Sequence, residues 1–440
     1  MRPQPSIALL TFSYEIEDFL DKIKVSLESF CTEMTGGWLF GFIEALRQQG
    51  VRTVLVCVSG RVTEPASFTH TPSGSAVWVL PSPAVYRRLK RHIPKPYGRN
   101  VEQAFGSLHG LRRLKFPLFW VCKELAPYFT TPRKSLADVL RNERCEAILC
   151  QEYEYARFDF CVALGRRMGV PVFGVFQGGD YQRGRLERVV RPLTVRSCAG
   201  LIVATRRESE RVRSRYGVGP AKLARIFNPL DLTVWQAVDR TKARAELGIP
   251  PGARVALWHG RVSIQQKGLD ILLNTWVEVC RRLDGRELRL LLVGDGRDAP
   301  ELRRLIGEFG LTNVQWVNEY VLDRDRMRRY LSAADVYVFP SRHEGFPVAP
   351  LEAMACGLPV VAADANGVED ILEDGERSGG VIVPRDDVAA LADACVRILA
   401  DEDLGREMGR RARNRIETHF SLEAVGPQLR DFLLTGVGTT

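Results

Sequence analysis

The stretch VYVFPSRHEGFPVAPLEAMACGLPVVAA, residues 336–363, contains a strand, a loop, a helix and a second strand. Four apolar residues at 336–339 predict a buried strand, and the following loop leads to Pro347 and Pro350. Both prolines suit the first turn of a helix, where a missing amide is tolerated. Gly357 predicts the end of that helix, just before the next apolar run. The order strand, helix, strand predicts two parallel strands of one sheet.

The same alternation extends along most of the chain. Strands that are apolar throughout and alternate with helices indicate parallel sheets covered on both faces. Their number predicts an α/β protein with two doubly wound, Rossmann-like domains facing a central cleft, with ligands at the carboxyl ends of the strands. The predicted strands are 6–12, 52–60, 145–151, 171–177, 200–206 and 222–228, then 254–260, 288–296, 314–320 and 336–341. The pattern lapses at 229–252, where prolines cluster, so we place the domains at 1–230 and 231–420.

Composition narrows the class of protein. The chain has 440 residues, of which 45% are hydrophobic and 26% charged, which is typical of a globular protein of two domains. Its ten cysteines include no C-x-x-C pair and mostly lie in apolar runs, which predicts reduced, buried thiols. The first apolar segment is short and soon followed by acids, and no run of 18 apolar residues occurs. We therefore expect a cytoplasmic protein without a transmembrane helix.

Charge is divided unevenly along the chain. The net charge is +9, and the excess of Lys and Arg lies within residues 1–230, whereas the remainder is mildly acidic. Segments 85–100 and 111–129 combine cations with aromatic residues, including Trp120 and Phe129. This combination suits either peripheral attachment to an anionic membrane or a solvated basic face over a core. Because no nucleic-acid-binding motif accompanies the charge, we do not expect nucleic acid as a partner.

Two acids in the opening stretch are candidate ligand-binding residues. Glu344 falls in the loop at the end of a strand, and Glu352 falls about one turn into the following helix. They can face different parts of one elongated ligand, with the amides of the loop between them meeting a phosphate. Alternatively, Glu352 only complements the dipole of the helix.

Cations follow another strand end. Arg261 comes just after the strand at 254–260, and Lys267 and Gly268 come at the start of a predicted helix. Two cations beside a helix N-terminus predict an anion site, although they can equally be surface charges beside a loop. The glycine-rich segment at 293–296 lacks the full dinucleotide-binding spacing, which favours a tight strand-to-helix turn over a ligand contact.

These motifs together resemble the retaining GT-B glycosyltransferases of family 4, the glycosyl transferases group 1. The resemblance rests on the E-x7-E pattern of EGFPVAPLE, the pair GR…KG, VGDG, SAADVYVFPS and GVIVPRDD, which occur in the family's order and spacing. It covers nearly the whole second domain. It implies an acceptor-side first domain, a donor-binding second domain and a final helix, 421–440, that crosses back to the first domain.

The resemblance also implies roles for individual residues. Arg261 and Lys267 would bind the diphosphate of a nucleotide-sugar and stabilise its departure, and Glu344 would bind sugar hydroxyls, so these three are the expected catalytic residues. Glu352 would bind the ribose. The remaining expected donor contacts are Gly260, Gly268, Asn318, Tyr320, Val321, Gly345, Phe346, Pro347 and Val348.

The first domain resembles the family less closely. Gly36 and Gly37 match a glycine-rich loop whose backbone approaches the diphosphate. Gln177 stands where the family often has His, and a neutral amide cannot take a proton there. Tyr153 and Gln177 are the expected acceptor-side residues. The acceptor pocket in this architecture comes mainly from loops of the first domain.

We therefore expect a retaining hexosyltransferase that moves a sugar from a nucleotide-diphosphate donor to a hydroxyl acceptor, such as a lipid-linked or polysaccharide precursor. No cofactor and no metal is expected, because no His/Cys cluster has ligand spacing and the DRD at 323–325 only opens a helix. A nucleotide-sugar epimerase and a non-catalytic nucleotide-sugar-binding scaffold remain alternatives. A glycosidase is disfavoured, since its two carboxyls must flank one bond at about 5–9.5 Å.

Overall fold

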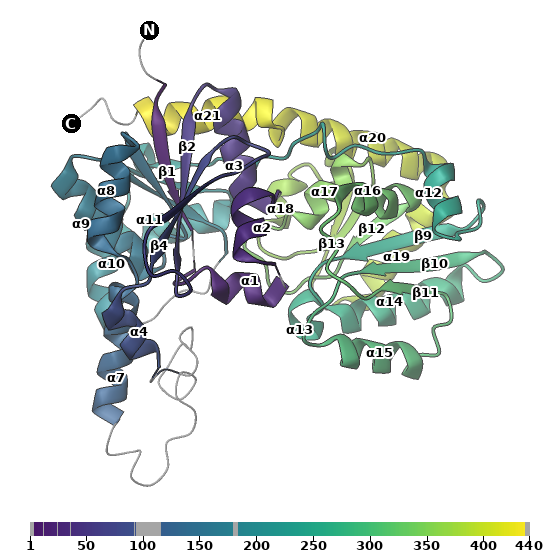
Figure 1. Cartoon of the computed structure of the whole chain (residues 1–440). Coiled ribbons are helices and arrows are strands. Elements are labelled where there is room, and N and C mark those ends of the chain that lie inside the picture. The colour runs from purple at the N-terminus through teal and green to yellow at the C-terminus, as the bar shows by residue number, and fades with distance from the viewer. Residues whose placement is uncertain are drawn as a thin grey trace. The chain divides into compact units, whose positions relative to one another are not determined.

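The structure is a computed structural model that describes residues 4–11, 13–23, 25–35, 37–91, 93, 116–178 and 184–435. The chain divides into two compact units (Figure 1). Unit 1 comprises Met1–Ile226 and Gly426–Thr440, and unit 2 comprises Phe227–Val425. The predicted boundary at residue 230 falls near this division. The chain returns to unit 1 within its last helix, α21 (Leu422–Thr435).

Unit 1 contains an eight-stranded sheet in the order β3-β4-β2-β1-β5-β6-β7-β8. All neighbouring strands are parallel except β3 and β4, which are antiparallel. The strands are β1 (Ser6–Leu10), β2 (Arg52–Ser59), β3 (Ala66–Thr69), β4 (Ala76–Pro81), β5 (Ala147–Gln151), β6 (Val172–Phe176), β7 (Gly200–Val203) and β8 (Leu223–Ala224). The sequence predicted six of these but not β3 and β4.

Helices cover both faces of this sheet. Residues of α8, α9, α10 and α11 share one apolar core with β1, β2, β5, β6 and β7, and α3 lies against β2 (Figure 1). Phe432 of α21 contacts Phe173 of β6, with ring centroids 5.4 Å apart. The helices are α1 (Glu17–Ile23), α2 (Leu27–Thr32), α3 (Gly37–Gln48), α4 (Ala84–Lys90), α7 (Phe116–Leu125), η1 (Ala126–Phe129), α8 (Arg133–Asn142), α9 (Ala156–Met168), α10 (Arg185–Ser197), α11 (Arg206–Tyr216) and η2 (Pro220–Lys222).

Unit 2 contains a six-stranded parallel sheet in the order β11-β10-β9-β12-β13-β14. The strands are β9 (Arg254–His259), β10 (Leu288–Val293), β11 (Val314–Val317), β12 (Val336–Phe339), β13 (Val360–Ala363) and β14 (Gly380–Val383). Successive strands run outward from β9 in one direction and from β12 in the other. The two doubly wound sheets are those that the apolar strand pattern predicted.

Helices cover both faces of the second sheet as well. The helices α14 and α15 pack together on one face with α19, and α16 and α17 lie on the other (Figure 1). The bounds are α12 (Arg240–Glu246), α13 (Ile264–Lys267), α14 (Leu269–Arg282), α15 (Ala299–Glu308), α16 (Arg324–Ala333), α17 (Ala349–Ala355), α18 (Val368–Ile371), η3 (Gly375–Ser378), α19 (Val388–Ala400) and α20 (Glu402–His419).

Two further observations concern the chain as a whole. All ten cysteines are free, and most are buried, as the sequence predicted. Within the described residues, no helix combines the length and apolar character needed to cross a membrane.

Candidate active site

The candidate site of unit 2 lies where the strand order reverses, between β9 and β12. These strands are parallel neighbours, with Val336 opposite Ala256 and Tyr337 opposite Leu257. In open parallel sheets such a reversal opens a crevice at the carboxyl ends of the strands, because the connections on its two sides lead away from each other. The loops that follow β9 and β12 carry the residues that the sequence singled out.

Lys267 and Glu344 are brought into direct contact. Lys267 ends the short helix α13, and its ammonium nitrogen donates to the Glu344 Oε1 atom at 2.7 Å. Both side chains are mostly shielded, with 17% and 10% of their surfaces exposed. A charge-assisted hydrogen bond is stronger when water is partly excluded. The residues expected to bind diphosphate and sugar are therefore direct neighbours.

Gly268 makes this contact possible. It lies between α13 and α14 with a φ of +63°, in the left-handed region that favours glycine. A Cβ atom at this position would lie 2.1 Å from the carbonyl oxygen of Pro340, which follows β12. The absence of a side chain thus allows the loop of β9 to touch the loop of β12. Gly268 is the N-cap of α14 and Lys267 directly precedes it, so the two residues lie at the start of a helix as predicted.

Glu352 has a different partner, which the sequence analysis missed. Its Oε2 atom lies 2.9 Å from Nε2 of His259, the last residue of β9. His259 is 7% exposed, and Tyr337 donates its hydroxyl hydrogen to the carbonyl oxygen of His259 at 3.2 Å. The other ring nitrogen, Nδ1, is buried and has no partner among the described residues. A histidine ending an apolar strand, directly before Gly260, was the available signal.

The two glutamates therefore have separate roles in the geometry. Glu344 pairs with a cation of the loop after β9, and Glu352 pairs with a ring at the end of β9. Glu352 does more than complement the helix dipole, because it has its own partner from a neighbouring strand. The arrangement is that of two distinct polar contacts along the edge of one sheet.

The loops after β9 and β10 are packed backbone against backbone. The amide of Gly260 donates to the carbonyl of Val293 at 3.0 Å, and a Cβ atom on Gly294 would lie 1.8 Å from the carbonyl oxygen of Gly260. The glycine-rich segment at 293–296 leads from β10 towards α15, as the sequence favoured, and its glycines also allow this close backbone contact. Arg261, next to Gly260, is exposed, and its guanidinium donates to Oε1 of Gln266 at 3.0 Å.

The segment after β11 also faces Glu352. Partial burial, and then the negative charge of Glu352, raise the pKa of the Tyr320 hydroxyl. Burial lowers the pKa of the Arg324 guanidinium, and the negative charge of Glu352 partly offsets this effect. The Arg324 guanidinium therefore also lies near Glu352. Arg324 lies 5.4 Å above the ring of Trp235 and was not predicted from the sequence. Asn318 is exposed, and Val321 is half-buried.

The loop before α17 is fixed by an aromatic cluster. Phe346 is 6% exposed and stacks on Phe227, with centroids 5.6 Å apart, and Phe227 stacks on Phe420 at 4.5 Å. The side-chain amide of Asn366 donates to the carbonyl of Gly345 at 3.0 Å. The Phe346 side chain is therefore a packing residue of the loop, and a donor contact at this position stays a prediction for its backbone amide. Pro347 is buried, and Val348 is half-buried directly before α17.

The site residues expected in the first domain lie in different environments. Gly36 lies outside the described residues, and Gly37 begins α3. Tyr153 is fully buried, and its hydroxyl is hydrogen-bonded to Glu208 and Arg211. A side chain enclosed in this way cannot contact an acceptor, which corrects the expectation for Tyr153. Gln177 is half-buried just after β6, and its backbone amide lies 3.3 Å from Oε2 of Glu152.

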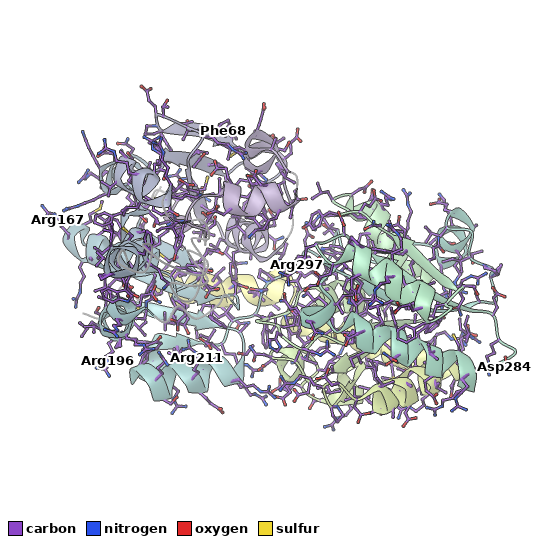
Figure 2. All side chains as sticks on the ribbon, turned by 90° about the horizontal axis from the view of Figure 1, so that it is seen from below. Phe68, Arg167, Arg196, Arg211, Asp284 and Arg297 are labelled. Atoms are coloured by element: carbon purple, nitrogen blue, oxygen red, sulfur yellow. The ribbon has the colours of Figure 1, made fainter. Side chains whose placement is uncertain are left out.

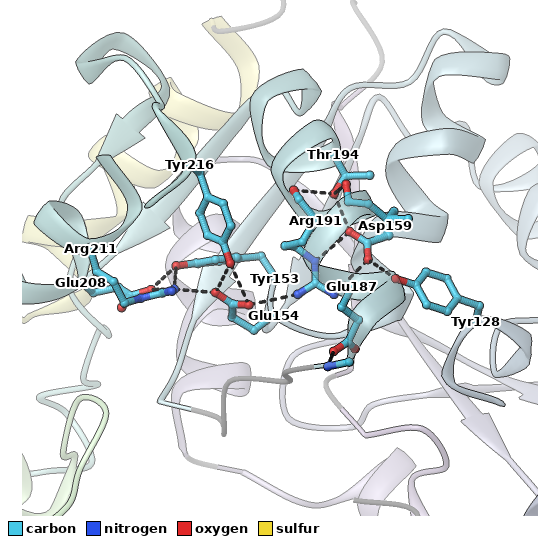
Figure 3. Close-up of polar contacts among 12 residues, drawn as sticks. Tyr128, Tyr153, Glu154, Asp159, Glu187, Arg191, Thr194, Glu208, Arg211 and Tyr216 are labelled. Atoms are coloured by element: carbon cyan, nitrogen blue, oxygen red, sulfur yellow. Dashed lines mark hydrogen bonds and ion pairs between the residues drawn. The ribbon is translucent and has the colours of Figure 1, made fainter. Parts of the chain in front are cut away.

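Tyr153 belongs instead to a buried ionic network in unit 1 (Figure 3). Arg191 is 2% exposed and binds Asp159 through two nitrogens at 2.8 and 2.9 Å, and Glu154 at 3.1 Å. Glu154 also accepts from Arg211 at 2.5 Å and from Tyr216 at 2.8 Å. Buried charges require such partners, because an unpaired one is strongly destabilising. The network joins α9, α10 and α11.

Glu187 lies beside this network in α10. Burial raises the pKa of its carboxyl to about 7, against an opposing effect of Arg191. The Oε2 atom accepts a hydrogen bond from the amide of Gly184 at 3.1 Å, whereas Oε1 is buried without a partner among the described residues. The residue is therefore poised between its neutral and charged forms near neutral pH.

Metal coordination has no candidate in the described part of the chain, where no three His, Cys, Asp or Glu side chains are grouped to hold an ion.

Comparison with known proteins finds a match to a family model within the second unit. Residues 253–401 match the family model for glycosyl transferases group 1. Among curated relatives, the α-D-kanosaminyltransferase of Streptomyces kanamyceticus is 29% identical over 60% of this chain and 71% of its own length. A D-inositol 3-phosphate glycosyltransferase of Nocardia farcinica is 34% identical over 48% of this chain and 47% of its own. The chain thus spans about half the length of most curated relatives it matches.

Solved structures are similar over almost the whole chain. Sucrose-phosphate synthase of Thermosynechococcus elongatus has a TM-score of 0.65 at 21% identity, covering 97% of this chain and 98% of that one. HepE of Anabaena, solved with UDP and glucose, has a TM-score of 0.64 at 16% identity, covering 98% of this chain and all of its own. Likeness at this identity shows the fold, which is the GT-B fold expected from the sequence.

Proposed function

Because the chain carries a glycosyl transferases group 1 domain at residues 253–401, we propose that it is a retaining glycosyltransferase. It transfers a hexosyl unit from a nucleotide-diphosphate sugar to a hydroxyl group of an acceptor. One observation carries the proposal. Lys267 pairs with Glu344, and His259 pairs with Glu352, and both pairs lie where the strand order of unit 2 reverses.

The reaction assigns each pair a task. Lys267 and Arg261 hold the donor diphosphate and stabilise the negative charge that grows on it as the glycosidic bond breaks. When the diphosphate takes over Lys267, Glu344 becomes free to accept hydrogen bonds from the sugar hydroxyls. Glu352, oriented by His259, accepts from the ribose, and Tyr320 lies near it where a base would follow.

The acceptor proton needs no base from the protein in this proposal. The leaving diphosphate lies on the same face of the sugar as the incoming hydroxyl in a front-face displacement, and its oxygen takes that proton. The anomeric configuration is then retained. Neither a metal nor another cofactor has a step assigned to it, because the two cations supply the electrostatic stabilisation.

Donor turnover tests the proposal. UDP-sugars are the first candidates, since HepE was solved with UDP and glucose, followed by GDP-, ADP- and TDP-sugars. Purified protein is incubated with each donor and a pool of acceptors, and the free nucleotide diphosphate and the anomer of the product are measured. Glu344→Ala serves as the inactive variant. Isomerised donor without free nucleotide identifies an epimerase, binding without turnover identifies a scaffold, and an inverted product contradicts retention.

We also propose that unit 1 attaches to an anionic membrane surface, which would bring a lipid-linked acceptor to the enzyme. Seven of the ten large apolar side chains that are exposed among the described residues lie on α4, α7, η1 and α10. These elements pack on one another, and Arg185 of α10 lies 5.5 Å above the ring of Trp120 in α7. The seven are Val85, Leu118, Val121, Leu125, Phe129, Val189 and Leu193.

Cations border these apolar side chains. Arg185, Arg188 and Arg196 are exposed on α10, and Arg87 and Arg88 are exposed on α4. An apolar surface with a basic border favours the interface of an anionic bilayer. Of the two predicted basic segments, residues 92, 94–100 and 111–115 lie outside the described residues.

Vesicle sedimentation tests the attachment. The protein is expected to sediment with phosphatidylglycerol vesicles at low salt and not with phosphatidylcholine vesicles. Leu193→Asp removes an apolar contact worth about 1.5–3 kcal/mol if fully buried, so the bound fraction falls about tenfold or more. Val277→Asp, at an exposed apolar residue of α14, is the control. Equal sedimentation of wild type and Leu193→Asp overturns this assignment.

A further inference from the structure

A basic pocket lies in unit 1 at the opposite edge of the sheet from the strand ends that usually carry ligands. It has a volume of about 800 Å³ and is formed by α8, the end of α9 and the turns that lead into β5 and β6. Arg144 and Cys145 precede β5, and Val170 precedes β6, so the pocket borders the amino ends of these strands. It is separate from every residue of the candidate active site.

Cations line the rim of the basic pocket. Arg133, Lys134, Arg141, Arg144 and Arg167 are all exposed there, and Figure 2 shows Arg167 at the margin of unit 1. Asp138 is the acid of the lining, and it pairs with Arg141 at 3.0 Å. In the part of the chain that the structure describes, no ion pair forms with the other four cations.

The placement of two of these cations is electrostatically unfavourable. Arg133 and Lys134 are the first residues of α8, whose first turn contains no acid. The N-terminus of a helix carries a partial positive charge that repels cations. Gathering four uncompensated cations around such an end is destabilising unless an anion neutralises them. The charge pattern therefore fits a negatively charged ligand.

The floor of the pocket is apolar. Leu140, Cys145 and Leu164 are buried beneath the rim, and Met168 and Val170 are half-buried beside them. Burial raises the pKa of the Cys145 thiol to about 11, so it stays neutral and behaves as a small apolar side chain. Inorganic phosphate alone would contact only the rim.

We propose that the basic pocket binds a phosphorylated amphiphile, with its phosphate groups on Arg144, Arg167 and the start of α8 and its apolar part on the floor. Guanidinium groups bind phosphate oxygens through charge-assisted, bidentate hydrogen bonds. An apolar segment gains further affinity from burial against Met168 and Val170, which keep part of their surface exposed. This site is independent of the donor site and of the proposed transferase reaction.

Calorimetric titration of the full chain with geranyl diphosphate tests the proposal. Geranyl diphosphate is expected to bind more tightly than either inorganic pyrophosphate or geraniol, and its affinity is expected to fall with added salt. Arg144→Glu and Arg167→Glu each weaken binding by about tenfold, because an attraction becomes a repulsion. Arg167→Gln gives a smaller loss and shows that charge, not misfolding, is responsible.

Two controls fix the location of the ligand. Arg166→Glu changes an exposed arginine beside Arg167 that does not line the pocket, so binding stays at the wild-type level. Lys267→Ala, in the candidate active site, also leaves this binding unchanged. Wild-type affinity in both pocket variants overturns the proposal, as does an equal loss in Arg166→Glu or a loss confined to Lys267→Ala.

A vesicle experiment distinguishes a lipid headgroup in a membrane from a free phosphorylated amphiphile as the ligand. The pocket variants are sedimented with phosphatidylcholine vesicles that contain a polyprenyl diphosphate. If their sedimentation falls in parallel with geranyl diphosphate binding, the ligand is a lipid headgroup in the membrane. If sedimentation is unchanged while geranyl diphosphate binding falls, the ligand is a free phosphorylated amphiphile.

Discussion

The ammonium group of Lys267 lies 2.7 Å from a carboxylate oxygen of Glu344, and the two residues are 77 positions apart in the chain. Each has most of its surface shielded from solvent. A donor that displaces this pair would leave a cation for its diphosphate and a carboxylate for its sugar. In the structure, each of the two groups neutralises the charge of the other.

Replacing Lys267 by Ala should lower kcat/KM for the nucleotide-sugar by about 10²–10³, the usual effect of removing one group that stabilises developing negative charge. Steady-state kinetics with the donor found in the turnover assay measures it. Lys242→Ala, at an exposed lysine of α12, should have wild-type kinetics. A Lys267→Ala enzyme with unchanged kcat/KM would remove the cation from its role.

Replacing His259 by Ala should raise the KM for the donor, because Glu352 loses the ring that orients it. We expect an increase of about tenfold, corresponding to one lost hydrogen bond to a charged group at about 1.5 kcal/mol. His259→Gln, which can still donate a hydrogen bond to Glu352, should recover part of the affinity. Equal KM values for both variants and wild type would contradict a positioning role.

Replacing Gly294 by Ala should destabilise unit 2 by more than about 2 kcal/mol. The added Cβ atom would lie 1.8 Å from the carbonyl oxygen of Gly260, and the φ of +143° disfavours any side chain. Urea unfolding followed by circular dichroism measures the change. Gly307→Ala is the matched control: it lies in α15 with open space around it, and should stabilise by about 0.5–1 kcal/mol.

Replacing Arg191 by Met should destabilise unit 1 by about 3–5 kcal/mol, because Asp159 and Glu154 would be left buried without their shared cation. Arg188→Met, at an exposed arginine of the same helix, is expected to change stability by less than about 0.5 kcal/mol. Thermal unfolding of both variants provides the comparison, and similar melting temperatures would refute the structural role of Arg191.

Glu187 should make unit 1 less stable at higher pH. Its folded-state pKa of about 7 lies above the ordinary value of 4.5, so the folded state keeps a proton that the unfolded state loses. Stability is therefore lost as pH rises from about 4.5 to about 7, by roughly 3 kcal/mol. Glu187→Gln should remove this loss and be more stable than wild type at pH 8. Denaturation at pH 5 and pH 8 checks it, with the exposed Glu210→Gln as control.

The sequence was sufficient to predict most of both sheets. Long apolar runs between amphipathic helices have few other solutions than parallel strands covered on both faces. β3 was missed because it is a short edge strand, half exposed, that carries no apolar run of its own. Its pairing with β4 depends on the neighbouring sheet and not on its own residues. β4 has an apolar run, AVWVLP, which the sequence analysis overlooked.

Individual roles were harder to predict than the fold. Tyr153 was expected to contact the acceptor, and its side chain is enclosed by partners that lie far away in the sequence. His259 and Arg324 were overlooked because nothing in their local sequence relates them to Glu352. Burial and long-range pairing are properties of the assembled structure.

By itself, the sequence determined the order of helices and strands along the chain. It also determined where the glycines of the tight loops and the two glutamates after β12 fall. Only the tertiary structure decided their partners. Lys267 pairs with Glu344 over 77 residues and His259 with Glu352 over 93, because β9 and β12 are parallel neighbours and Gly268 lets their loops touch. Spacing along a chain fixes local geometry, whereas register between strands fixes which charges meet.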